Sequence, residues 1–226
     1  MIETVFLDAG GVLVHPNFDR VAAALLKHGV EADAGGLRDL EPLAKRDLED
    51  PSFIRASSDD ARGLVYFATV LKRAGIEVDD RVRAALTELR AYHAVHNLWE
   101  TVTPGLVPFL ERLKARGLRR VVVSNANGTL HAHFDRLGLT PHFEAIFDSY
   151  CEKVEKPDPR FFEIAMERSG ARRETTVHVG DFYEIDIVGA RSAGLRAILL
   201  DPSGVNADRD CERVASLEEL ASSLGA

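Results

Sequence analysis

Six residues in four short segments have the types and the spacing to do chemistry together. Each segment ends an apolar run or opens a helix, so its polar groups come at the boundary of a predicted element. The carboxyl ends of parallel strands meet at one edge of a sheet, where ligands bind in open α/β folds. We therefore expect these side chains to lie close together. They are Asp8, Ser124, Asn125, Lys156, Asp181 and Asp186.

The carboxylates in this set constrain its chemistry. By itself, Asp8 could equally be a residue that caps a turn. If Asp8, Asp181 and Asp186 converge, however, they repel one another and raise each other's pKa. A divalent cation removes this repulsion, and Mg²⁺ prefers oxygen ligands of this kind. Ser124 and Lys156 then suit an anion beside the metal, for which a phosphoryl group is the best fit.

The elements that must position these residues alternate between strands and helices. Short apolar runs predict buried strands, and the segments between them have helical spacing, most with a glycine near the end. Strands separated by helices imply an α/β fold with a parallel, doubly wound sheet. Strands are expected at 4–7, 120–125, 145–148, 176–181 and, as the last one, 196–200, and helices at 106–116, 130–137, 159–170, 186–193 and 218–224.

Residues 15–98 have helical patterns with no strand between them. Four amphipathic segments follow one another, and the third has an apolar stripe that starts at Leu64. Consecutive amphipathic helices of this kind form a small bundle. We therefore divide the chain into an α/β core, residues 1–14 and 99–226, and an inserted all-helical subdomain, residues 15–98.

The composition narrows the class of protein. The 226 residues carry a formal net charge of −8, which disfavours a general nucleic-acid binder. No apolar run approaches the roughly 18 residues that span a membrane, and the chain starts in a strand rather than in a signal peptide. The two cysteines lie far apart and outside metal-ligand spacing. These features predict a cytoplasmic protein that binds neither nucleic acid nor membrane.

In this order, the four segments resemble the motifs of the haloacid dehalogenase-like (HAD) hydrolase superfamily, which consists mostly of phosphatases. The resemblance covers nearly the whole chain, and residues 15–98 resemble the helical cap of the family. Each motif is weak alone, but four in order at these spacings are specific. They are Asp8-Ala9-Gly10-Gly11-Val12-Leu13, Ser124-Asn125, Lys156-Pro157-Asp158-Pro159, and Gly180-Asp181 with Asp186 five residues later.

The resemblance implies a role for each matching residue and a small phosphorylated metabolite as substrate. Asp8 would be the nucleophile, forming an aspartyl-phosphate that splits one hard step into two easier ones. Asp8, Asp181 and the backbone carbonyl of Gly10 would hold Mg²⁺. Asp186 would bind a metal-bound water or orient Lys156, which would also neutralise charge near Asp8. The residues that bind the substrate would be Ser124, Asn125 and Lys156.

Gly10 departs from the family pattern. Phosphatases of the family usually have a second Asp two residues after the nucleophile, which protonates the leaving group and later activates water. The metal contact can survive in this chain because it uses the backbone carbonyl, but the acid/base side chain is gone. General acid–base catalysis accelerates a reaction by roughly 10²–10⁴-fold. We therefore expect a slow phosphatase, a phosphatase that acts on esters with good leaving groups, or one in which another residue serves as the acid/base. His15 is a candidate substitute, although a hinge residue is the simpler interpretation.

Three other functions stay open. A metal-independent dehalogenase would use Asp8 in an ester intermediate, but Asp181 and Asp186 would then repel its anionic substrate. A phosphonate-cleaving enzyme would tolerate a small residue at position 10, but it needs a lysine from the cap. A binding or regulatory protein would keep the pocket and have lost turnover. Neither the substrate nor the oligomeric state follows from the sequence.

His178 lies in the predicted strand at 176–181, two residues before Gly180. Because the strand is expected to be buried, we expect His178 to be a core histidine with satisfied hydrogen bonds. Phe182, Tyr183 and Glu184 follow in the fourth motif, where they could line the pocket or face solvent.

Overall fold

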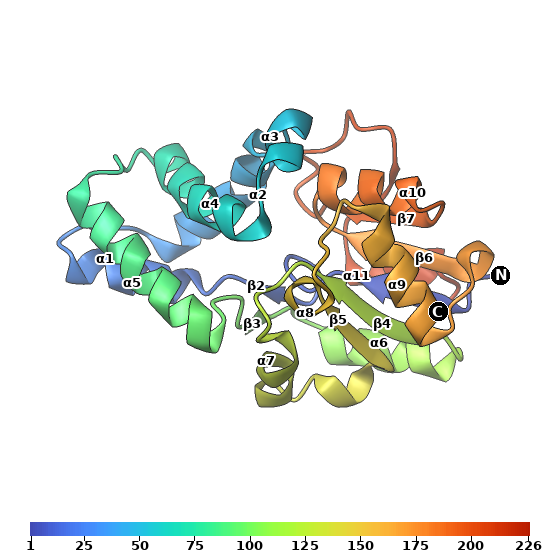
Figure 1. The fold of residues 1–226 in the computed structure, drawn as a ribbon. Helices are drawn as coiled ribbons and strands as arrows, with labels where there is room; N and C mark the ends of the chain where they lie inside the picture. The colour runs from blue at the N-terminus through green and yellow to red at the C-terminus, as the bar shows by residue number, and fades with distance from the viewer. The chain divides into compact units, whose positions relative to one another are not determined.

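The structure, a computed structural model, describes the backbone of all 226 residues and every side chain except those of Arg55, Asp60 and Leu64. The apolar stripe expected to start at Leu64 thus includes a side chain outside the described ones. The chain divides into two compact units, each with its own apolar core. We call Met1–His15 with Thr101–Ala226 the sheet unit and Pro16–Glu100 the helical unit (Figure 1).

A six-stranded sheet forms the centre of the sheet unit. Every neighbouring pair of strands is parallel, so the predicted α/β class with a parallel, doubly wound sheet is confirmed. The first strand lies in the middle, and the residues that follow it and its two neighbours therefore share one edge. In spatial order the strands are β5 (Ala145–Asp148), β4 (Arg119–Ser124), β1 (Thr4–Leu7), β6 (Thr176–Gly180), β7 (Arg196–Leu200) and β8 (Glu212–Val214).

The position of the last strand corrects the sequence prediction. We expected β7 to be the last strand, and this is wrong because β8 follows it at the edge of the sheet. β8 has three residues, of which Glu212 and Arg213 are exposed. It therefore lacks the apolar run that identifies β1 and β6 in the sequence.

Helices flank the sheet, with α9 packed beside α10 on one side and α6 beside α11 on the other (Figure 1). In α9 the sequence sets both ends: Asp158 accepts a hydrogen bond from Arg160 N, Pro159 is the first helical residue, and Gly170 ends the helix in the left-handed conformation. The helices are α6 (Leu106–Ala115), α7 (Leu130–Arg136), α8 (Ser149–Glu152), α9 (Pro159–Ser169), α10 (Gly189–Ser192) and α11 (Leu217–Ser223), with 3₁₀ turns at Thr140–His142 and Arg173–Thr175.

The helix expected at 186–193 has a different form. The chain first makes a π-helical turn, Tyr183–Val188, and only then enters α10. The turn is held by two contacts between the same residues: Asp186 N donates to Phe182 O, and Phe182 N donates to Asp186 Oδ2 at 3.0 Å. Turns of this kind are frequent at functional sites. The π-helical form of this segment thus depends on side-chain contacts of Asp186, and the periodicity of the sequence does not reveal them.

Two short strands lie where the chain leaves the sheet unit and returns to it. β2 (Val14–His15) pairs antiparallel with β3 (Thr101–Val102). The pairing brings His15 opposite Thr101, so both connections to the helical unit start from the same small sheet. Two-residue strands carry no periodic pattern, and the sequence does not predict them.

The helical unit contains five helices around an apolar core. The sequence pattern predicts four of them and misses α3, whose six residues are too few to show helical periodicity. The first turn of each helix is capped by a polar side chain, in chain order Asn17, Asp33, Asp50, Ser58 and Asp79. The helices are α1 (Phe18–Lys27), α2 (Ala34–Asp47), α3 (Pro51–Ala56), α4 (Asp59–Arg73) and α5 (Asp80–His96). In the part of the chain that the structure describes, no helix is long and apolar enough to cross a bilayer.

Candidate active site

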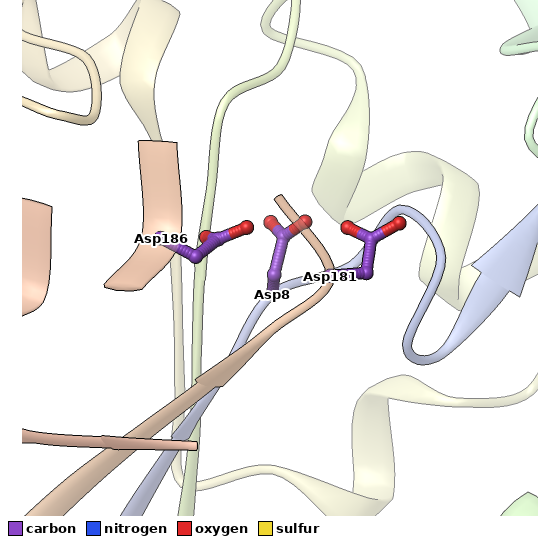
Figure 2. A group of neighbouring side chains, drawn as sticks. All are labelled: Asp8, Asp181 and Asp186. Carbon is purple, nitrogen blue, oxygen red and sulfur yellow. The ribbon is translucent and has the colours of Figure 1, made fainter. Parts of the chain in front are cut away.

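Three carboxylates meet at the carboxyl edge of the sheet. Asp8 follows β1, Asp181 follows β6, and Asp186 comes from the π-helical turn after β6. Each offers an oxygen, and the three oxygens lie within 4.8 Å of one another. Figure 2 shows the three side chains in a row with Asp8 in the middle. We call Asp8, Asp181 and Asp186 the acidic cluster; strand order brings together residues that are up to 178 positions apart.

A buried lysine joins two members of the acidic cluster. Lys156 Nζ donates to Asp8 Oδ1 at 2.7 Å and to Asp186 Oδ1 at 2.6 Å, and its side chain is 1% exposed. Burial alone would lower the pKa of Lys156, but the two carboxylates outweigh it and hold that pKa above its usual value. The lysine is therefore a permanent cation inside the site.

The surroundings of the Asp8 carboxyl disfavour its charged form. Burial raises the pKa of Asp8, the nearby charge of Asp186 raises it further, and Lys156 and Ser124 only partly offset the two effects. One ammonium thus faces three carboxylates. A second cation in the site would favour the ionised form of Asp8 that a nucleophile requires.

Asp186 is held by three hydrogen bonds. Its Oδ1 accepts from Lys156 Nζ and lies 2.9 Å from His178 Nε2, and its Oδ2 accepts from Phe182 N. Burial alone would raise the pKa of Asp186, but Lys156 and His178 lower it well below its usual value. Both oxygens are thus engaged within the protein, which suits a residue that orients Lys156.

Two glycines make room for the acidic cluster. Gly11 has a φ of +72°, and a Cβ atom there would lie 1.8 Å from Asp181 Oδ2. A Cβ atom at Gly180 would lie 2.1 Å from Asp186 Cγ. Gly10 is not among the glycines with positive φ. The turn therefore requires glycine at position 11, and the φ at position 10 is open to other residues.

Ser124 and Asn125 end β4 beside Asp8, but they are used differently. Ser124 is buried, its hydroxyl donates to Asn125 O at 3.3 Å, and it lies close enough to Asp8 to lower the pKa of that carboxyl. Asn125 Nδ2 donates to Lys156 O at 3.0 Å, and Asn125 Oδ1 accepts from Lys156 N at 2.8 Å. The Asn125 amide thus clamps the backbone of Lys156, which favours a positioning role over the contact with substrate that the resemblance implies.

His15 lies in β2, and its ring contacts Thr103 on the segment that returns from the helical unit. Its Nε2 lies 3.0 Å from Thr103 Oγ1, which in turn donates to Val12 O at 2.8 Å. It borders a hollow that Gly11 and Thr103 also line, but neither Asp8 nor Lys156 does. This geometry favours the hinge interpretation over a substitute acid/base.

His178 is the site residue that sequence reasoning missed. The expectation of satisfied hydrogen bonds is correct for Nε2, which pairs with Asp186, and wrong for Nδ1, which is buried with no hydrogen-bond partner. The available signal was a polar residue between Val177 and Val179 in an apolar strand, two positions before Gly180. That signal does not reveal which atom the ring would contact.

The chain is similar in sequence to known proteins. A model of the family described as haloacid dehalogenase-like hydrolase matches residues 2–194. Haloacid dehalogenase-like hydrolase domain-containing protein 3 of Danio rerio is 36% identical over 149 residues, covering 62% of this chain and 61% of that protein. Glyceraldehyde 3-phosphate phosphatase of Methanothermobacter thermautotrophicus is 35% identical over 122 residues, 53% of each. The chain thus spans little more than half the length of these relatives.

Solved structures are similar over the full length of the chain. A 2-haloacid dehalogenase from Pseudomonas syringae pv. Tomato DC3000 is 28% identical, with a TM-score of 0.61, and the match covers 100% of this chain and 99% of that chain. Similarity therefore extends to proteins named for two different reactions.

Proposed function

Because the chain belongs to the haloacid dehalogenase-like hydrolases, we propose that it is a Mg²⁺-dependent phosphatase that acts on a small phosphorylated metabolite. The observation that carries the proposal is the acidic cluster, whose oxygens lie within 4.8 Å of one another beside the buried Lys156. Similarity to a protein named glyceraldehyde 3-phosphate phosphatase supports hydrolysis of a phosphate ester.

In this proposal the Asp8 carboxylate attacks phosphorus through Oδ2, because Lys156 holds Oδ1. The bond from Asp8 to phosphorus forms as the bond from phosphorus to the leaving oxygen breaks. Water then hydrolyses the aspartyl-phosphate and restores Asp8. The hydroxyl of Ser124 and the ammonium of Lys156 lie next to Asp8, where they would bind the oxygens of the phosphoryl group.

The residues present fit a hard divalent cation. The donors would be the carboxylates of Asp8 and Asp181 and the Gly10 carbonyl, all oxygen atoms of the kind that Mg²⁺ prefers. Gly11 supports this assignment, because any side chain there would collide with Asp181. When bound, Mg²⁺ would polarise a phosphoryl oxygen and offset the negative charge of the acidic cluster. Asp186 would serve the ion indirectly, through Lys156 or a metal-bound water.

Gly10 sets the expected limit on the rate. Without an acid at this position, the leaving oxygen must depart as an anion or take its proton from water, so esters with good leaving groups would react fastest. Hydrolysis of the aspartyl-phosphate would also lack a base to activate water. We therefore expect the intermediate to accumulate during turnover.

The helical unit would be the cap that selects the substrate. The insertion proposed from the sequence spans residues 15–98, and the compact unit is Pro16–Glu100. A small metabolite as substrate agrees with a net charge of −8, since a nucleic-acid partner would call for a basic surface. A cytoplasmic location is part of the same proposal.

An assay of phosphorylated metabolites with Mg²⁺ and with EDTA tests the proposal. We expect turnover that disappears in chelator, returns with Mg²⁺ and falls to background in Asp8→Asn, which keeps the shape of the site but removes the attacking charge. Asp201→Asn is the matched control, because Asp201 is a buried carboxylate after β7 that accepts from Asn206 N. Equal rates for the two variants would contradict the proposal.

A 2-haloacid dehalogenase is the second candidate, favoured by the full-length similarity at 28% identity and by the missing acid at Gly10. Asp8 would then attack carbon and displace halide, and no metal would be needed. The acidic cluster argues against it, because Asp181 and Asp186 would repel a carboxylate substrate. Halide release from a 2-haloacid in EDTA, with no phosphate release under any condition, would establish this candidate instead.

A further inference from the structure

The His178 side chain makes one hydrogen bond, to Asp186 of the proposed catalytic machinery. The residue lies in the middle of β6 with 0% exposure. Its Nε2 lies 2.9 Å from Asp186 Oδ1, the oxygen to which Lys156 Nζ also donates at 2.6 Å. An ionised carboxylate only accepts hydrogen bonds, so the imidazole must carry its proton on Nε2. His178, Asp186, Lys156 and Asp8 thus form a continuous chain of contacts.

Packing alone does not explain a histidine at this position. Its Nδ1 is buried without a hydrogen-bond partner, and its ring packs edge-on against Phe162 at 5.0 Å between centroids. An aliphatic residue would fill the same space without leaving a buried lone pair unpaired. What such a residue cannot do is donate to Asp186. Burial lowers the pKa of His178 despite the neighbouring carboxylate, in keeping with a neutral donor.

We propose that His178 is a positioning residue for the reaction at Asp8. Its Nε2–H and the Phe182 N–H fix the two oxygens of Asp186, so that Asp186 holds Lys156 where the ammonium orients Asp8 for attack. The kinetic part rests on the proposed function, whereas the contact chain does not depend on it. The residue touches no reacting atom, and its effect reaches Asp8 through Asp186 and Lys156.

Two substitutions separate the donor from the volume of the ring. His178→Leu keeps an apolar side chain in the core and removes the donor. His178→Gln can place an amide N–H close to where Nε2 stands and so restores the donor. His133→Leu is the matched control, because His133 is equally buried but lies in α7 and contacts Arg136. A thermal melt of each variant shows which of them are folded at the assay temperature.

We expect His178→Leu to lower kcat by about 10–100-fold, the loss typical when an outer-shell partner is removed, and to change KM less. We expect His178→Gln to recover most of the rate, and His133→Leu to match the wild type. A structural role alone would lower the melting temperature of both His178 variants without separating their kcat values. A folded His178→Gln that is as slow as His178→Leu, or a His178→Leu with wild-type kcat, would overturn the proposal.

Crystal structures of the two variants make the test independent of turnover. We expect the hydrogen bond from Lys156 Nζ to Asp8 Oδ1 to be lost in His178→Leu and kept in His178→Gln. If the wild type hydrolyses no phosphate ester but the variants show this difference, the proposed function fails and the positioning role stands. If turnover is present but the bond is intact in His178→Leu, the positioning role fails and the proposed function stands.

Discussion

Each unit of the molecule holds a lysine against buried carboxylates, but the two arrangements are built differently. In the helical unit, Lys45 Nζ lies 2.7 Å from Glu41 Oε1, one turn earlier on α2, and Tyr66 of α4 donates to the same oxygen. In the sheet unit, Lys156 meets Asp8 and Asp186, which are 148 and 30 residues away. The first pair needs one helix to form, whereas the second needs the completed sheet.

The balance of charge around each lysine distinguishes a structural ion pair from a candidate cation-binding site. Glu41 meets one ammonium and one hydroxyl, which satisfies a single carboxylate. Lys156 meets two carboxylates, with Asp181 as a third close by. Among the described side chains, the acidic cluster is the only group of three residues that could hold a metal ion. Under the proposed function, the excess negative charge around the buried Lys156 is where a further cation would bind.

The largest expected contrast is between Lys156→Met and Lys45→Met. Removing Lys156 leaves Asp8 and Asp186 buried without a counter-ion, which should cost about 3–5 kcal/mol of unfolding free energy and abolish turnover. Removing Lys45 leaves Glu41 with its bond from Tyr66, so the cost should be about 1–3 kcal/mol. Urea unfolding at neutral pH measures both. Equal costs would mean that the two lysines serve the same structural purpose.

Gly10→Asp adds a carboxylate beside the acidic cluster and tests what the missing acid limits. Hydrolysis of alkyl phosphates should rise by about 10²-fold, the lower end of what acid–base catalysis supplies. Release of p-nitrophenolate in a single turnover, which does not depend on the later hydrolysis of the aspartyl-phosphate, should rise much less, because this phenolate leaves with little protonation. Rates for both esters are measured together with a thermal melt. A stable variant with unchanged or lower rates on alkyl phosphates would show that this carboxylate is not limiting.

Mg²⁺ should stabilise the protein through the acidic cluster and not through Glu41. A ligand at 100 times its Kd adds about 2.7 kcal/mol to the unfolding free energy. We therefore expect the melting temperature to rise with Mg²⁺ in the wild type and in Glu41→Gln, and to stay constant in Asp181→Asn. A Mg²⁺-dependent rise in Asp181→Asn that equals the wild-type rise would place the ion elsewhere.

The smallest contrast compares two glycines, one in each unit. Gly11→Ala forces a positive φ on a residue with a Cβ atom and collides with Asp181, so it should cost at least about 1–2 kcal/mol and weaken Mg²⁺ binding. In Gly63→Ala, the new Cβ has no atom within 4 Å and the residue lies inside α4. This substitution should raise the unfolding free energy by about 0.5–1 kcal/mol. Urea unfolding should show changes of opposite sign in the unfolding free energy of the two variants. An unchanged unfolding free energy in Gly11→Ala would refute the collision with Asp181.

Much of the fold could be predicted because its signals are local. The apolar run before Asp8 and the Asp158-Pro159 start of α9 identify their elements without any tertiary information. β8 and α3 are too short to show a period, and the start of the π-helical turn at Tyr183 depends on bonds between Asp186 and Phe182. These elements are stabilised by contacts that become visible only in the folded chain.

The candidate site was predictable as a set of residues but not as a set of contacts. Motif order is enough to bring Asp8, Lys156 and Asp186 to one edge of the sheet. It does not reveal that the Asn125 amide hydrogen-bonds the Lys156 backbone or that His178 donates to Asp186. Both contacts join segments that are distant in sequence or face each other across a turn, so residue type alone leaves them undetermined.

Trapping the aspartyl-phosphate is the most direct test of Asp8 as the nucleophile. The wild type is mixed with p-nitrophenyl phosphate and Mg²⁺, quenched in acid, reduced with borohydride and analysed by peptide mass spectrometry. We predict a phosphoryl group on intact protein and reduction of Asp8 to homoserine, both absent in EDTA and in Asp8→Asn. Because Gly10 provides no base, the intermediate should be easy to trap. Phosphate release with no label at Asp8, or with a label on another residue, would contradict the account.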